Sequence, residues 1–341
     1  MPAPSPLDLL RTVVIAWTLA ACTTTPAAGP PATVTLVKEF AGGALPYACL
    51  EDSFLLGDAT SFARVVVTGS GLETVKQYDL SDYLFGGTYG IVERLVPFES
   101  AGFVGVVSGE GMRFVRLSDN KSLGLLRPAQ VPKPPLFTHE HYLYGVGTSE
   151  SGLEQVLIVV NVANPAAPVI ERQEGVTEPT AVAHDAGRFF LLERGALSSW
   201  SLQDPAHPKR VSTVTLGGSA AQDVHGVGMF HGHAHVWVEG EVVRIQVSDS
   251  GVLTATTNPW TAKKFVGHFA AAPALDALLG GGEQVGRWVD TSGGLTPISF
   301  PSGRGPTRDS CFAGRDLVYI HQRITDGVES TVFGTFAPPT P

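Results

Sequence analysis

The sequence predicts an all-β protein in which one multistranded unit recurs along the chain. Glycine (39 residues) and proline (25) are abundant and only 16% of the 341 residues are charged, a composition typical of a chain with many turns. The hydrophobic fraction of 43% is large enough for a folded core. A five-residue signature also occurs five times, each time at the end of an alternating apolar run. Its successive positions are hydrophobic, polar, hydrophobic, small or polar, and finally Asp or Asn.

The five copies of this signature have regular spacing. Each copy is typical of a strand with one apolar face, followed by an Asp or Asn side chain that closes a turn. A second apolar strand lies upstream of each copy, as at 103–107 and 189–192, so each unit holds several strands. The copies end at Asp82, Asp119, Asn164, Asp204 and Asp249, which are 37, 45, 40 and 45 residues apart.

Two degenerate copies extend the series to seven units. They lie near Trp288–Ser292 and Val332–Phe336. Repeats of roughly 40–45 residues with four strands each are typical of β-propeller blades. We therefore expect a seven-bladed β-propeller, although six or eight blades would also fit the repeat.

The two ends of the repeat array complement each other. The last unit stops soon after its third strand, at Phe336, while Thr33–Phe40 is an alternating strand without a unit of its own. We expect residues 33–40 to form the outer strand of the last blade, because this pairing removes an exposed sheet edge.

Two units carry a more specific pattern, at 157–168 and 197–208, where the strand is followed by Asn-Pro or Asp-Pro and a second proline. These segments resemble the LVIVD-repeat β-propellers of bacterial surface and secreted proteins. In that family an Asp usually precedes the last strand residue; Asn161 and Ser201 replace it here, and Asp79 retains it. The resemblance spans residues 45–337, and it implies the propeller fold and an exported protein.

Residues 1–22 have the features of an export signal. An apolar run, Val13–Ala21, follows Arg11 and has the length of a signal-peptide core of roughly 7–15 residues. Leu19–Cys22 resembles the lipobox of bacterial lipoproteins, which implies that Cys22 carries a lipid. An ordinary secretory signal that contains a cysteine is the alternative.

This signal predicts the domain organisation and the location. Residues 23–32, rich in Thr, Pro and Ala, would form a flexible tether, and residues 33–341 the propeller domain. Thr23 stands where an aspartate often retains lipoproteins on the inner membrane, which favours the outer membrane in a Gram-negative cell. We therefore expect a lipid-anchored protein of the cell envelope.

Two further cysteines occupy equivalent positions in units one and seven. Cys49 and Cys311 each lie shortly before a second strand. The two units are neighbours if the ring closes, and disulfides persist in exported proteins. A Cys49–Cys311 disulfide is therefore one prediction, and two buried free thiols are the alternative.

A histidine cluster is the strongest candidate metal site. His231, His233 and His235 follow His225, and neutral imidazole is a common metal ligand. Gly232, however, has the character of a turn residue, which would place His231 on one strand and the other two on the next. The sequence therefore assigns no metal ligand and leaves copper, nickel or zinc binding open.

No catalytic or cofactor-binding residue can be assigned from the sequence. The common hydrolase, metalloprotease, nucleotide and calcium motifs are absent, and a net charge of −9 without a basic stripe argues against nucleic acid as a partner. We expect a monomeric, non-catalytic binding or assembly scaffold for an envelope protein, peptide or glycan. The alternative is a propeller enzyme, a metal-dependent lactonase-like hydrolase or a lyase, with its site in the central channel. Its candidate residues are Glu93, Glu140, His184, Asp185, Asp223, His225 and Asp276.

Overall fold

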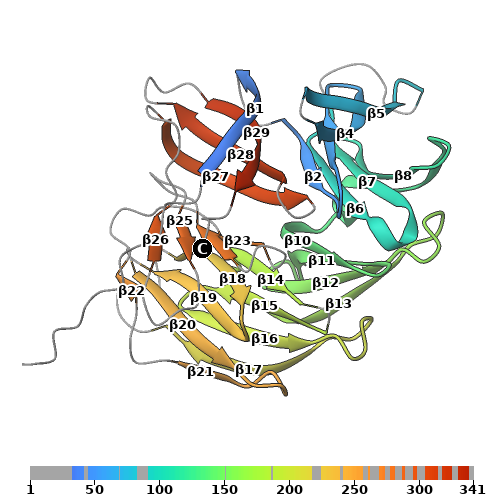
Figure 1. Ribbon diagram of the computed structural model, residues 1–341. Helices are drawn as coiled ribbons and strands as arrows, with labels where there is room; N and C mark the ends of the chain where they lie inside the picture. Colours follow the sequence, from blue (N-terminus) through green and yellow to red (C-terminus); the bar gives the residue numbers. More distant parts are fainter. Residues whose placement is uncertain are drawn as a thin grey trace, which may run out of the picture.

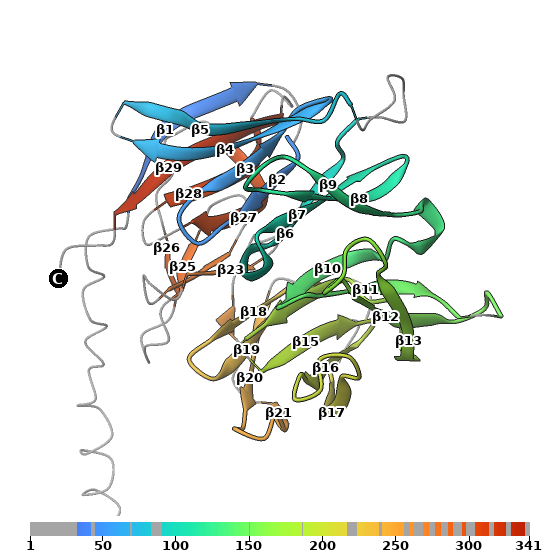
Figure 2. The same cartoon turned by 90° about the vertical axis from the view of Figure 1, so that its right-hand side faces the viewer.

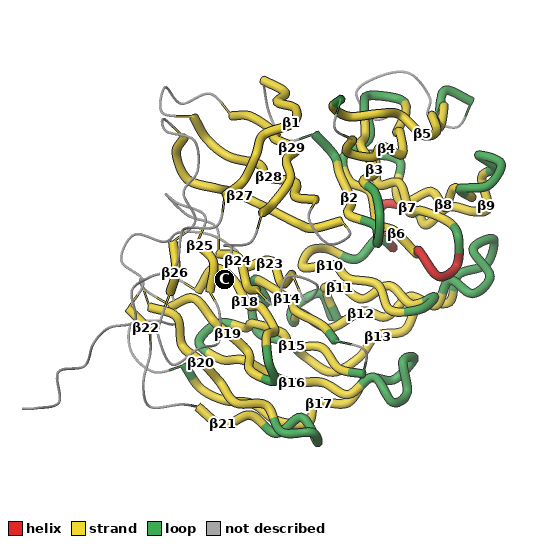
Figure 3. The backbone as a smooth tube through the Cα atoms, in the orientation of Figure 1, coloured by secondary structure: helices red, strands yellow, loops and turns green. Residues whose placement is uncertain are grey.

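The described part of the chain is all-β (Figure 3). Its only helical segments are two short 3-10 helices, η1 (Glu99–Ala101) and η2 (Pro128–Gln130). None of the described helices is long or apolar enough to cross a membrane. The computed structural model describes residues 33–41, 45–68, 70–82, 91–149, 151–185, 187–216, 224–238, 241–255, 260–261, 269–272, 277–280, 286–288, 295–297, 304–313, 317–324 and 329–337.

The described strands form seven antiparallel sheets, and six of these use strands that follow one another in sequence. Sheet 1 contains β2 (Tyr47–Cys49), β3 (Phe54–Gly57), β4 (Ser61–Thr68) and β5 (Gly71–Asp79). Sheet 2 contains β6 (Arg94–Phe98), β7 (Phe103–Ser108), β8 (Gly111–Arg116) and β9 (Ser122–Leu126). Sheet 3 contains β10 (Lys133–His139), β11 (Tyr142–Thr148), β12 (Gln155–Asn161) and β13 (Val169–Gly175).

The next three sheets continue the same order. Sheet 4 contains β14 (Ala181–His184), β15 (Arg188–Glu193), β16 (Ala196–Ser201) and β17 (Lys209–Thr215). Sheet 5 contains β18 (Val224–Phe230), β19 (His233–Val238), β20 (Glu241–Val247) and β21 (Leu253–Ala255), and β22 (Trp260–Thr261) also pairs with β20. Sheet 6 contains β23 (Phe269–Ala272), β24 (Ala277–Gly280), β25 (Gly286–Trp288) and β26 (Leu295–Pro297).

Sheet 7 joins the two ends of the described chain. It contains β27 (Arg304–Ala313), β28 (Leu317–Ile324), β29 (Glu329–Ala337) and, at its edge, β1 (Thr33–Ala41). The strand expected at residues 33–40 is therefore β1, and it pairs antiparallel with β29, Thr33 opposite Ala337 and Ala41 opposite Ser330. Figures 1 and 2 both show β1 beside the C-terminal strands.

The first strand of each sheet contacts the first strand of the next sheet. These contacts run from β2 through β6, β10, β14, β18 and β23 to β27, and β27 in turn contacts β2. In Figure 1 these strands face a common central region. The first strands therefore bring together residues that are far apart in sequence.

Apolar side chains fill the space between neighbouring sheets. Between sheets 3 and 4, Tyr144, Trp200 and Phe189 are fully buried, and the Phe189 and Trp200 rings stack 5.5 Å apart. Between sheets 7 and 1, the rings of Phe333 and Phe54 meet edge to face at 5.2 Å. Alternation along each strand supplies an apolar face to each neighbour, and burial of these faces stabilises the arrangement.

The repeated signature marks a third strand in sheets 2 to 5 but a fourth strand in sheet 1. The later copies end β8, β12, β16 and β20, whereas the first copy ends β5. The copies therefore do not all occupy the same position in their sheets. The turn chemistry is nevertheless shared, because Asp79 accepts from the Ser81 amide (2.8 Å) and Asn161 from the Ala163 amide (3.0 Å). The signature therefore indicates how a strand ends and does not indicate the position of that strand in its sheet.

Candidate functional site

A cavity of about 550 Å³ lies where the first strands of several sheets meet. Strands β2, β6, β10, β14 and β27 all contribute to its wall. The apolar part of the lining includes Pro46, Tyr47, Leu95, Leu136 and Phe137. Its volume is within the usual range of small-molecule sites, which makes this cavity the candidate functional site.

The wall between β6 and β10 is fixed by packing and by one hydrogen bond. The Thr138 hydroxyl on β10 donates to the carbonyl of Pro97 on β6 at 2.9 Å. The neighbouring Phe137 ring is buried between two other rings, stacked on Tyr144 at 4.5 Å and on His184 at 5.4 Å. These contacts connect β10 to β6 and to the His184 ring of β14 in the cavity wall.

Among the described residues that line this cavity, Arg94 is the one lysine or arginine, and its guanidinium is charged at neutral pH. Arg94 begins β6 and reaches solvent through the cavity, but surrounding protein lowers the pKa of its guanidinium. The neighbouring carboxylate of Glu93 acts in the opposite direction and raises that pKa. Among the residues that the structure describes, no hydrogen bond or ion pair engages the Arg94 guanidinium.

His184 contributes an imidazole from sheet 4 to the same cavity. Protein atoms around this solvent-accessible ring lower the pKa of His184, and the nearby His139 lowers it further. Asp185 has a smaller, opposing effect on that pKa. The neutral imidazole is therefore favoured at neutral pH.

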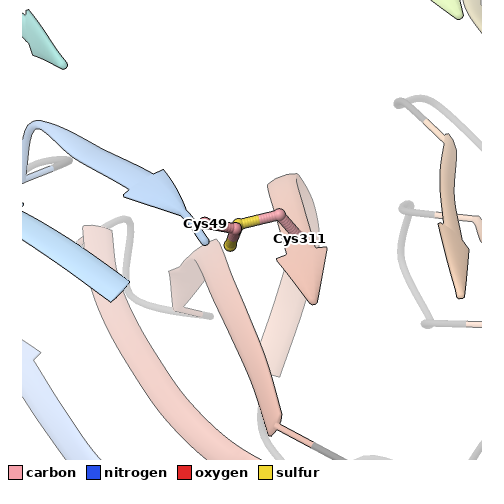
Figure 4. The surroundings of a disulfide bond; sticks show 2 residues. All are labelled: Cys49 and Cys311. Carbon is pink, nitrogen blue, oxygen red and sulfur yellow. A yellow bond between two sulfur atoms is a disulfide. The ribbon is translucent and has the colours of Figure 1, made fainter. Parts of the chain in front are cut away.

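A disulfide joins Cys49 to Cys311 (Figure 4). Both cysteines line the cavity. The disulfide connects β2 of sheet 1 to β27 of sheet 7 across a sequence separation of 262, and the two Cα atoms are 6.3 Å apart. The pair proposed from the sequence is thus bonded in the structure.

The candidate catalytic residues occupy different environments. Glu93 and His184 line the cavity. Asp185 instead closes the turn between β14 and β15, where it accepts from the Gly187 amide at 3.1 Å and from Arg188 at 3.0 Å. Glu140 is exposed in the turn before β11, with a positive φ of 53°. Asp223, Asp276 and the side chain of His225 lie outside the described residues.

The histidine cluster is arranged around a tight turn. His231 and Gly232, with φ of 48° and 70°, form the two-residue connection between β18 and β19. His231 therefore lies in the turn, which corrects the expectation that it lies on a strand, whereas His233 and His235 lie on the next strand, β19, as expected. The His231 ring stacks on Phe230 at 4.0 Å. His233 uses one ring nitrogen on the His231 carbonyl (2.8 Å) and the other on Arg244 (3.2 Å).

His235 is fully buried on β19. Its ring lies 6.4 Å from that of His233. Within the described residues, no group of three His, Cys, Asp or Glu side chains is placed to hold a metal ion. Cys22, the predicted lipid site, and the tether at 23–32 lie outside the described residues.

Sequence analysis did not single out Arg94 or Thr138. Neither residue belongs to a local motif, because each first strand contributes only a few side chains to the cavity. One signal was present: the charged residues Glu93 and Arg94 stand directly before and at the start of an otherwise apolar strand, β6, which lines the cavity.

One solved structure, described as KlHsv2 with loop 6CD replaced by a Gly-Ser linker, is similar to this chain. The TM-score is 0.56 at 10% sequence identity, and the match covers 87% of this chain and 100% of that one. No family model and no curated protein matches the sequence. At this identity the likeness supports an all-β fold with several four-stranded antiparallel sheets and carries no information on activity.

Proposed function

We propose that this chain is a lipid-anchored envelope protein with a seven-bladed β-propeller, and that it is a non-catalytic binding protein whose ligand site is the central cavity. Its ligand or partner is an envelope protein, peptide or glycan. The anchor is Cys22, and the repeats are of the LVIVD type.

Three contacts support a closed ring of seven blades. The first strands touch in sequence and β27 touches β2, β1 completes sheet 7 by pairing with β29, and Phe54 packs against Phe333 between sheets 1 and 7. Each contact joins the beginning of the domain to its end, as closure requires.

The composition of the cavity wall carries the binding proposal. Apolar residues outnumber polar ones in the wall, although polar atoms make up about half of its exposed surface. The polar side chains come from three sheets and are those of Arg94, Glu93, Thr138 and His184. Such a surface provides contact area from its apolar part and orientation from its polar part, as in most ligand sites. Walls built on strands also keep their shape on binding, which reduces the entropy cost.

A cavity-filling variant tests this function. Thr138→Trp places an indole in the cavity, and Thr213→Trp, on the exposed outer strand β17, is the matched control. We expect the wild type and Thr213→Trp to retain the same envelope component in quantitative pull-downs, and Thr138→Trp to lose it. Equal retention of this component by all three proteins would refute the cavity as the binding site. A stoichiometric metal ion that is bound by the wild type and lost in His184→Ala would instead favour the enzyme alternative.

The anchor is tested separately by fractionation. We expect the full chain to remain with membranes and to incorporate labelled fatty acid. Cys22→Ser should abolish the label and release the protein into the soluble fraction. A labelled Cys22→Ser protein would refute this lipid site.

A further inference from the structure

We propose that Arg94 and His184 form a binding site for a single carboxylate carried by a ligand with an apolar body. This inference rests on the proposed function, in that it takes the central cavity as the ligand site. It adds the chemical class of the ligand, which nothing in the sequence motifs indicates.

Arg94 provides the positive charge. Arg94 lines the cavity and is exposed there, while nearby protein lowers the pKa of its guanidinium. No described residue hydrogen-bonds to it. A guanidinium in this state gains most from a carboxylate, whose two oxygens match its planar N–H donors.

His184 provides a second polar group from a different sheet. Its ring is held against Phe137 at 5.4 Å, and no described residue hydrogen-bonds to its ring nitrogens. Asp185, the adjacent carboxylate, is occupied by Arg188 and the Gly187 amide. The imidazole can therefore donate an N–H bond to a ligand oxygen while it remains neutral.

Glu93 restricts the charge of the ligand. Its carboxylate lines the same cavity and acts electrostatically on Arg94. A phosphate or dicarboxylate would bring two negative charges close to Glu93, whereas a monocarboxylate brings one, which Arg94 balances. Repulsion of this kind makes a site specific, so the geometry favours a monoanion.

The remaining wall fits an apolar group next to the carboxylate. Pro46, Tyr47, Leu136 and Phe137 line the cavity beside the polar residues. A volume of about 550 Å³ holds a ligand of the size of an acylated amino acid with room to spare. Two sources share this chemistry: a free aromatic or aliphatic acid, and the C-terminal residue of a peptide.

Calorimetric titration of the full chain carrying Cys22→Ser tests the inference with N-acetyl-phenylalanine and with its primary amide. We expect the acid to bind about tenfold or more tightly than the amide, a difference that Arg94→Gln should remove. Arg94→Lys should fall between the two, because lysine keeps the charge but loses the planar pair of donors. Arg194→Gln is the control, since Arg194 is exposed and pairs with Glu178.

The possible outcomes separate this inference from the proposed function. Equal binding of acid and amide, abolished for both by Thr138→Trp, would overturn the carboxylate site and leave the cavity as a binding site. Absence of binding of either probe at about 10 mM would also overturn the carboxylate site, while the pull-downs with Thr138→Trp would still decide the proposed function. A peptide ending in phenylalanine that binds much more tightly than the free acid would support the site with a peptide terminus as its source, and equal affinity would support it with a free acid.

Discussion

Removal of the Cys49–Cys311 disulfide should strongly destabilise the protein, with little change to the folded structure. The double variant Cys49→Ala, Cys311→Ala deletes two half-buried sulfurs, while the Phe54–Phe333 contact and the β1–β29 pairing remain. The main effect is therefore expected in the unfolded chain. A cross-link over a sequence separation of 262 restricts that chain by an entropy worth about 5 kcal/mol at room temperature.

Urea denaturation measures this effect. Relative to the wild type, the variant should lose on the order of 5 kcal/mol in the free energy of unfolding, with a steeper dependence on urea because its unfolded chain exposes more surface. Wild type treated with a reductant should behave like the variant, and the reductant should leave the variant unchanged. A loss below about 1 kcal/mol would refute the argument from chain entropy.

Three further predictions concern contacts between sheets and the cavity. In Gly124→Ala, on β9, the new methyl group would overlap the Pro165 carbonyl oxygen of sheet 3, and chemical denaturation should show a loss of roughly 1–3 kcal/mol. Tyr144→Phe removes the donor to the Pro205 carbonyl (2.7 Å) and should cost about 1–2 kcal/mol in the same assay. NMR titration should place His184 below its ordinary pKa of 6.5, since surrounding protein and His139 lower its pKa. Because the folded state then resists protonation of this ring, the free energy of unfolding should fall as the pH drops below 6.5. His184→Gln should reduce that fall.

Matched variants define what would contradict these expectations. Gly187→Ala is the control for Gly124, since a methyl group there meets open space; equal losses would contradict the steric argument. Tyr142→Phe is the control for Tyr144, because the Tyr142 hydroxyl has only a 3.5 Å contact with Asn161, and it should cost less. A His184 midpoint at or above 6.5 would contradict the placement of this ring in the cavity.

The strands and turns of this chain could be predicted from local sequence. The apolar runs at 103–107 and 189–192 are β7 and β15, and the orphan run at 33–40 is β1. The side chains of Asp119 and Asn164, the last residues of their copies, close turns as the signature predicts, since each accepts from a backbone amide two residues later at 3.3 Å. These features depend on alternation of polarity and on turn residues, both of which are encoded within a few positions.

The position of a strand in its sheet, from first to fourth, could not be predicted in the same way. The first signature copy ends β5, a fourth strand, although its local pattern matches the third strands β8 and β12. An apolar face and a closing turn are required of either strand, so the pattern does not distinguish them. Likewise, Asp185 and His184 are adjacent in sequence, but one closes a turn and the other lines the cavity.

The sequence by itself determined the all-β class, the repeated unit and the candidate cysteine pair, because each leaves a periodic or positional trace in the chain. Only the tertiary structure decided that Arg94, Thr138 and His184 share a cavity with the disulfide. The physical reason is that the cavity takes a few side chains from the first strand of each of several sheets. The packing of those sheets against one another decides which residues line the cavity. These residues do not recur at a regular interval along the chain, so a local sequence pattern does not reveal them.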